Sequence, residues 1–359
     1  MNLIGKTLSV MAVAISMLEP PSLSGQEHRV SVRGDVILFD QQETKILGLR
    51  CSNALMSDQT TEDLIDAFDL YREYGLNTVS VFLMGSRFGD VKGFLPDGSL
   101  NPLYRDRLER IIRAANQRAM IVIVGCLYWS TSKAKEELSH WTQIDADRAI
   151  ANTATWLKKL DFHNVILDPD NEGMAVRAKG WKIESMIQAA KRANATLVVA
   201  NNTKQSPPNE DLNMHFGKPE QGKPWFDSEA SPKNVPGGYW GTYSKETVRQ
   251  HPDFYNYSRI GRHTAEMKAN IFKRTIEETE QYNGLVLTST WLQCRPIEGI
   301  GGPFSKPGGR SNLGAFADEG APWNTEIDTL HPDAGILWWL EFVKERLGTT
   351  QQLNQSHSE

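Results

Sequence analysis

The sequence has few cysteines and lacks the short motifs that hold metals or nucleotides. Its 359 residues include three cysteines, Cys51, Cys126 and Cys294, which cannot all pair with one another. It contains no CxxC or HExxH pair and no phosphate-binding glycine loop, which are the motifs that mark common zinc and nucleotide sites. We therefore expect neither a bound metal nor a cofactor.

Runs of basic residues and long apolar runs are also absent from most of the chain. The formal net charge is −5, and no cluster of Lys and Arg marks a basic patch, so we expect no nucleic-acid partner. Beyond the amino terminus, no stretch approaches the roughly 18 apolar residues that would span a bilayer. These absences predict a soluble mature protein that does not contact a membrane, and we expect it to be a monomer.

The amino terminus itself has the order of features found in secretory signal peptides. Lys6 precedes an apolar run over 8–18, and Pro20-Pro21 separates this run from the small residues of 22–25. The pattern predicts a secreted or periplasmic protein, and a disordered or membrane-tethered tail is the alternative. The predicted organisation is a signal peptide (1–25), one folded domain (26–348) and a polar carboxyl-terminal tail (349–359).

Short apolar segments alternate with amphipathic segments along the rest of the chain. Short apolar runs predict buried strands, and apolar residues spaced by three and four predict helices. After an extended segment over 29–39, the alternation is typical of a parallel α/β architecture. The eight predicted strands cover 45–49, 76–83, 120–126, 165–168, 197–200, 212–216, 224–226 and 285–288, and the predicted helices cover 61–74, 104–118, 145–160, 180–194, 263–282 and 333–347.

A (β/α)8 TIM barrel and a doubly wound sheet share this pattern. We predict the barrel because polar residues that suit one shared site follow several of the strands, and all strands of a barrel open onto one mouth. The prediction is a single domain with long βα loops after the seventh strand (231–252) and after the eighth (297–309).

Two of the predicted strands lead into a glutamate. The fourth runs into Asn171-Glu172, and the seventh is followed by Glu229. Glycoside hydrolysis needs two carboxyl groups at the scissile bond: one protonates the leaving oxygen, and the other attacks the anomeric carbon or activates water. Glu172 and Glu229 are therefore the candidate catalytic pair.

This arrangement resembles the clan-A retaining glycoside hydrolases, the group that contains the cellulase- and mannanase-like family 5. The resemblance extends from about residue 45 to residue 291. It implies a (β/α)8 barrel in which Glu172 is the acid/base and Glu229 is the nucleophile. It also implies a carbohydrate partner, a polysaccharide or oligosaccharide that is cleaved at its O-glycosidic bonds.

Further positions agree with the resemblance. Family members often have a His on the sixth strand, here His215, and a Trp after the eighth, here Trp291, which forms the floor of the −1 sugar subsite. The resemblance implies that Asn171 bonds the sugar 2-hydroxyl, and Asn202, after the fifth strand, is short and polar enough to reach another hydroxyl. The aromatic residues that we expect to contact sugar are Trp129, Tyr128, Tyr239 and Trp240.

Two positions depart from the family pattern. Many members carry a Tyr near the sixth strand that contacts the nucleophile, whereas Phe216 follows the histidine here. An Arg inside the second strand is also frequent, but this strand reads Val-Ser-Val-Phe over 79–82. Either Arg50, at the end of the first strand, or Arg87, after the second, would have to replace it. Arg50 is therefore a candidate substrate-binding residue.

Three other interpretations use the same residues. Asp168, Asp170 and Glu172 reproduce the D-x-D-x-E spacing of chitinase-like family 18 barrels, in which the substrate's acetamido group is the nucleophile and no seventh-strand glutamate is needed. A second interpretation is a barrel that binds carbohydrate without cleaving it, because fold does not determine function. The third is a Ca²⁺ site built from the same three carboxylates.

Overall fold

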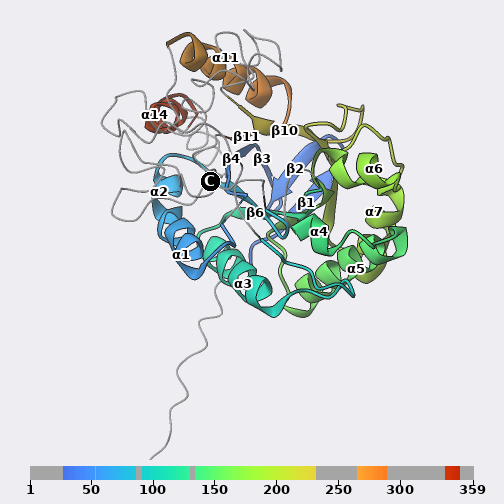
Figure 1. Cartoon of the computed structure of the whole chain (residues 1–359). Coiled ribbons are helices and arrows are strands. Elements are labelled where there is room, and N and C mark those ends of the chain that lie inside the picture. The colour runs from blue at the N-terminus through green and yellow to red at the C-terminus, as the bar shows by residue number, and fades with distance from the viewer. Residues whose placement is uncertain are drawn as a thin grey trace, which may run out of the picture.

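Eight parallel strands close into a barrel, with helices arranged around it (Figure 1). The structure is a computed structural model, and it describes residues 27–52, 54–85, 91–129, 134–231, 265–288 and 336–347. The strands follow the order β10-β11-β4-β5-β6-β7-β8-β9. Their bounds are β4 (Ile46–Arg50), β5 (Thr78–Phe82), β6 (Ile121–Leu127), β7 (Val165–Asp170), β8 (Val198–Asn201), β9 (Leu212–Met214), β10 (Trp225–Ala230) and β11 (Gly284–Leu287).

Local sequence signals mark where several helices begin. Asn101 caps α3 by accepting a hydrogen bond from the backbone N–H of Leu103 (3.2 Å), and Pro102 occupies the first helical position, where no N–H is needed. Thr142 and Asp145 form a capping box at the start of α5. The helices are α1 (Asp58–Asp66), α2 (Phe68–Glu73), α3 (Pro102–Asn116), α4 (Ala134–Glu137), α5 (Gln143–Lys159), α6 (Met174–Lys179), α7 (Ile183–Ala193), α11 (Ala265–Gln281) and α14 (Leu337–Arg346), with a 3-10 turn, η1 (Asn171–Gly173).

The barrel interior is filled with apolar side chains that alternate along the strands. Ile46, Ile123, Ile166 and Phe226 are all buried in this interior cluster, while the residues between them face the helices and form the larger outer core. Because apolar side chains fill the interior of the barrel, we expect a ligand site at its end, among the polar residues that follow the strands.

An antiparallel sheet of three short strands closes the amino-terminal end of the barrel. It consists of β1 (Val30–Arg33), β2 (Val36–Phe39) and β3 (Gln42–Thr44). Val30 and Ile37 of this sheet pack into the interior cluster. The backbone N–H of Val30 also donates to the backbone oxygen of His163, just before β7 (2.9 Å). The open end of the barrel is thus the opposite one, where the strands finish.

The predicted (β/α)8 barrel is confirmed, and the differences from the sequence-based prediction are local. The helix predicted over 61–74 is two helices, α1 and α2, which meet at Ala67. The helix predicted over 180–194 begins only at Ile183, because Gly180 takes a left-handed φ of 71° and ends α6 before it. The strand predicted over 224–226 continues to Ala230, so Glu229 lies within β10.

Several predictions concern segments outside the described residues. These are the signal peptide, the polar tail, and the long loops after β10 and β11, apart from Ser231. Within the described ranges, no helix has the length and apolar content that crossing a membrane requires.

Candidate active site

The carboxyl ends of β7 and β10 bring two glutamates together. Glu172 lies in η1, directly after β7, and Glu229 lies in β10. A side-chain oxygen of each and a ring nitrogen of His215, which follows β9, all lie within 4.8 Å of one another. Three neighbouring segments therefore place three titratable groups in one cluster at the open end of the barrel.

Two members of this cluster have a strained backbone. The φ angles of Glu172 and His215 are 55° and 45°, in the left-handed region that costs a non-glycine residue roughly 1 kcal/mol or more. The turn at Glu172 is held from both sides, because Asp170 accepts hydrogen bonds from the backbone N–H groups of Ala175 (2.9 Å) and Val176 (2.8 Å) at the start of α6. Such strain concentrates at functional sites, where a side chain must be aimed in a particular direction.

Arg50 connects the two glutamates from the end of β4. Its side chain is 1% exposed, its Nη1 lies 3.4 Å from Oε2 of Glu229, and its Nη2 donates to Oδ1 of Asn171 (2.9 Å). The amide nitrogen of Asn171 in turn lies 3.5 Å from Oε1 of Glu172. The predicted candidates Arg50 and Asn171 thus lie beside the glutamates, and Arg50 places a fixed positive charge next to Glu229.

The surroundings of Glu172 favour its protonated form. Burial raises the pKa of Glu172, the negative charge of Glu229 raises it further, and Arg50 opposes both, with a resulting pKa of about 8. A carboxyl group with such a pKa holds its proton at neutral pH and can donate it. Glu172 thus has the surroundings that a proton donor needs, while Glu229 lies beside the fixed positive charge of Arg50.

His215 is tied to a buried acidic residue on the neighbouring strand. Its Nδ1 lies 2.9 Å from Oδ1 of Asp227, which also accepts from the backbone N–H of Glu229 (3.0 Å). Arg274 of α11 donates to the other oxygen of Asp227. Burial alone would lower the pKa of His215, but the hydrogen bond and charge of Asp227 raise it overall. Asp227 therefore favours the protonated form of the imidazole beside the two glutamates.

The cluster of Glu172, His215 and Glu229 also has the spacing of a metal site. Metal ligands must be deprotonated, whereas the pKa values of both Glu172 and His215 are raised. The guanidinium of Arg50 lies next to Glu229 as well and would repel a cation. The charges of the site suit proton transfer better than they suit metal binding.

The two acidic residues of β7, Asp168 and Asp170, are buried and form hydrogen bonds within the protein. The amide of Asn202 donates to Oδ2 of Asp168 (3.0 Å), and its oxygen lies 3.4 Å from the backbone N–H of Phe216. Both Asp168 and Asn202 are 1% exposed. With the oxygens of Asp170 engaged at α6, Asp168, Asp170 and Glu172 do not form one of the clusters of possible metal ligands among the described residues. A sugar contact by Asn202 stays a prediction.

Of the aromatic residues expected to contact sugar, Trp129 packs among other aromatic rings, whereas Tyr128 lies beside Arg50. Trp129 follows β6 and is 8% exposed; its ring packs against those of Trp141 and Trp181, with centroid distances of 6.4 and 5.4 Å. Tyr128 lies beside Arg50, whose guanidinium is 5.8 Å from the centre of its ring. The remaining expected contacts, Trp291, Tyr239, Trp240 and Arg87, lie outside the described residues.

Sequence reasoning did not identify Asp227 and Arg274 as part of the site. Asp227 is 1% exposed, and two side chains hold it, His215 after β9 and Arg274 on α11. The available signal was its position two residues before Glu229, because alternate residues of a strand point to the same face. No comparable signal marks Arg274, which is one of several charged residues on an amphipathic helix.

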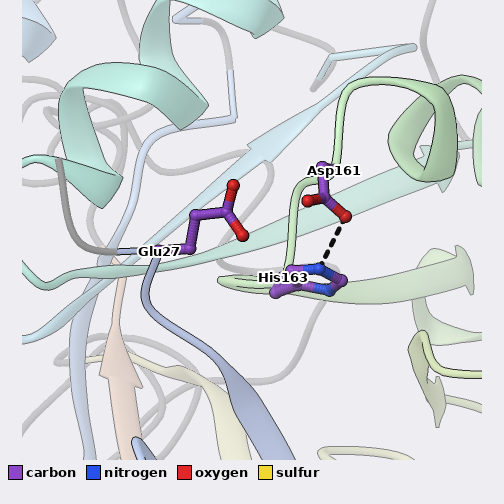
Figure 2. A group of neighbouring side chains, drawn as sticks. All are labelled: Glu27, Asp161 and His163. Atoms are coloured by element: carbon purple, nitrogen blue, oxygen red, sulfur yellow. Dashed lines mark ion pairs between the residues drawn. The ribbon is translucent and has the colours of Figure 1, made fainter. Parts of the chain in front are cut away.

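A second cluster of possible metal ligands lies at the other end of the barrel. It consists of Glu27, Asp161 and His163 (Figure 2). Glu27 and Asp161 are exposed, and Asp161 is already paired with Nε2 of His163 (2.8 Å). The cluster therefore has the character of a solvated surface ion pair, and we assign it no function.

Comparison with known proteins places the fold but gives no close relative. No protein-family model and no curated protein sequence matches the chain. A family 5 glycoside hydrolase structure from Bacteroides vulgatus aligns with a TM-score of 0.53 at 13% identity, over 77% of this chain and 66% of that one. The family 5 glycoside hydrolase mannosidase of Rhizomucor miehei aligns with a TM-score of 0.52 at 10% identity, over 93% of this chain and 100% of that one. At this identity the likeness shows the fold alone: the chain has the (β/α)8 barrel found in family 5 glycoside hydrolases.

Proposed function

We propose that the protein is a secreted glycoside hydrolase that cleaves O-glycosidic bonds of a polysaccharide or oligosaccharide with retention of configuration. The observation that carries the proposal is the facing pair Glu172 and Glu229, with side-chain oxygens within 4.8 Å of each other. Retaining enzymes hold their carboxyl groups about 5–5.5 Å apart, and inverting enzymes hold them about 6.5–9.5 Å apart. The short separation supports retention.

In this mechanism the two carboxyl groups have opposite roles. Glu172 protonates the leaving oxygen while Glu229 attacks the anomeric carbon, which gives a covalent glycosyl intermediate. Once Glu229 is esterified its negative charge is gone, so one cause of the raised pKa of Glu172 disappears. Glu172 can then act as the base that activates water for the second step.

The neighbouring residues fit this cycle. Arg50 stabilises the ionised form of Glu229 through its charge at 3.4 Å. Asn171, held by Arg50, is placed to bond the sugar 2-hydroxyl, a contact that strengthens in an oxocarbenium-like transition state. His215 lies on the same side, in the neighbourhood where the family pattern has a tyrosine, and Asp227 favours its protonated form.

The substrate-assisted alternative receives less support from the geometry. It would need Asp170 to orient the substrate's acetamido group, but both oxygens of Asp170 accept hydrogen bonds from the start of α6. It also leaves Glu229 and its partner Arg50 without a role. The likeness in fold to family 5 glycoside hydrolases supports the two-glutamate mechanism instead.

The test is reducing-sugar release from a broad panel of polysaccharides, with Glu172→Gln and Glu229→Gln variants run beside the wild type. We expect each variant to lose activity by about 10²-fold or more, and NMR of the first product to show the anomer of the substrate. Asp170→Asn is run beside them because the substrate-assisted mechanism needs this carboxylate. Asp170 also holds the turn at Glu172, so this variant is first checked for intact folding. Activity that depends on Asp170 and survives Glu229→Gln would favour the substrate-assisted mechanism. Sugar binding without turnover would favour the non-catalytic barrel.

A further inference from the structure

Two cationic side chains lie around one aromatic ring beside the catalytic pair. The half-buried Phe216 follows His215 after β9. Cζ of Arg177, on α6, lies 5.6 Å from the centre of its ring, and Nζ of Lys204, in the segment after β8, lies 5.4 Å from it. Three successive βα connections therefore contribute to one cation–aromatic group at the open end of the barrel.

This group adjoins the site directly. Arg177 donates through Nη1 to the backbone oxygen of Glu172, and the ring of Phe216 meets that of His215 edge-on, with centroids 4.7 Å apart. A sugar unit next to the one being cleaved would thus lie within reach of the Phe216 ring and of both cations.

Arg177 and Lys204 are both exposed. Neither forms an ion pair with a carboxylate in the part of the chain that the structure describes. The charge of Arg177 opposes the rise that burial causes in the pKa of Asp170, and the oxygens of Asp170 are engaged at the start of α6.

The residues that follow the ends of β7, β8 and β9 include more basic than acidic side chains. Over 171–182, 202–211 and 215–224, the sequence has six Lys or Arg residues and four acidic residues, Glu172, Glu210, Asp211 and Glu220. The whole chain has the opposite balance, with 39 basic and 44 acidic residues. Lys179, in the first of these connections, lies 5.6 Å from the ring centres of both Trp129 and Trp181. Among the described residues, Arg177, Lys179 and Lys204 thus place positive charge at the barrel mouth on the side next to Glu172.

We propose that Phe216, Arg177 and Lys204 form a subsite for an anionic sugar unit, one that carries a carboxylate or a sulfate ester. The proposal rests on the glycoside hydrolase function and narrows its substrate class. A guanidinium offers five N–H donors in a planar fork that matches both anions, and Arg177 has donors beyond the one used on Glu172. Lys204 adds a point charge, and the Phe216 ring holds the two cations near each other.

The alternative is that the two cations have only a structural role and cover the ring. A cation–π contact at an exposed site contributes about 0.5–1 kcal/mol to stability. The two explanations differ in what a charge-removing substitution does. If the cations only cover the ring, Lys204→Gln lowers stability slightly and affects activity on charged and neutral glycans equally. If they bind an anionic sugar, the same substitution weakens the use of charged glycans and leaves neutral ones unaffected.

The experiment uses matched glycans that differ only in charge. The mature protein is assayed on polygalacturonate and its methyl ester, and on carrageenan and its desulfated form, with neutral mannan and glucan alongside. We expect hydrolysis of one charged form in preference to its neutral partner. Lys204→Gln should raise KM for that glycan about tenfold with little change in kcat, and 0.5 M NaCl should weaken the preference. The first glycan pair tests a carboxylate and the second a sulfate ester.

Lys159→Gln is the matched control, because Lys159 is an exposed lysine at the end of α5, at the closed end of the barrel. Hydrolysis restricted to neutral glycans, with no effect of Lys204→Gln, overturns the subsite and leaves the glycosidase function intact. If nothing is hydrolysed, the glycosidase function fails, and gel retardation by the same glycans then tests the subsite alone. Retardation by a charged glycan that Lys204→Gln abolishes supports the subsite, and its absence for every charged glycan overturns it.

Discussion

Glu172 and Glu229 are the same residue type in different surroundings, and this difference predicts how activity depends on pH. Burial and the charge of Glu229 raise the pKa of Glu172 to about 8. The acid is therefore present in the free enzyme below that pH and lost above it. We expect kcat/KM to fall as the pH rises through about 8, in a pH profile measured at low substrate concentration. A basic limb centred below pH 6 would contradict the role of Glu172 as the acid.

Asp227 raises the pKa of His215 through its hydrogen bond and its negative charge. Asp227→Asn removes the charge and leaves an amide oxygen, a weaker acceptor than a carboxylate, for the imidazole, so this pKa should fall, as followed by NMR of the imidazole. The variant also leaves Arg274 without its buried partner, which we expect to lower the free energy of unfolding by about 3 kcal/mol. Glu278→Gln is the control, because Glu278 lies 3.8 Å from Arg274 and is not one of the main causes of the shift in the pKa of His215. An unchanged pKa of His215 in Asp227→Asn would contradict a role of Asp227 in the site.

At the scale of elements, the pairing of β5 with β6 supports the position of Arg50. Gly125 of β6 is opposite Phe82 of β5, and a Cβ at Gly125 would lie 2.1 Å from the Phe82 ring. Above the same ring, 4.6 Å from its centre, is the guanidinium of Arg50. The absence of a side chain on one strand thus makes room for the ring on which a charged group of a third strand rests.

Gly125→Ala is therefore expected to disturb the site as well as the core. The added methyl must displace Phe82, at a cost of about 1–3 kcal/mol in stability, and moving this ring shifts Arg50 away from Glu229. We expect kcat/KM to fall about tenfold, measured at a temperature where the variant remains folded. Phe82→Leu in the same chain should restore part of the stability by making room for the methyl. Full activity in Gly125→Ala would show that Arg50 does not depend on this ring.

At the scale of the whole molecule, the parts that the sequence predicted are those with local or periodic signals. The alternation of apolar runs with amphipathic segments predicted the barrel, and the order of Asn171, Glu172 and Glu229 along the strands predicted which side chains would meet. The link from Asp227 to Arg274 spans 47 residues, and no periodicity shows which residue of a helix turns towards a strand end. The left-handed backbone of Glu172 and His215 was equally hidden, because it is imposed by contacts and not by residue type.

The closed end of the barrel contributes to stability, and the open end holds the candidate catalytic residues. A substitution at the closed end tests whether these two roles are independent. Ile37 of β2 is fully buried and packs into the interior cluster from the end opposite the glutamates. Ile37→Ala leaves a cavity there, so the free energy of unfolding should fall by about 3 kcal/mol in denaturant titrations. Because the strand ends are held by the rest of the barrel, kcat/KM should stay within about twofold of the wild type at a temperature well below unfolding. A large loss of activity in the folded variant would mean that the interior packing transmits changes along the barrel to Arg50 and the two glutamates.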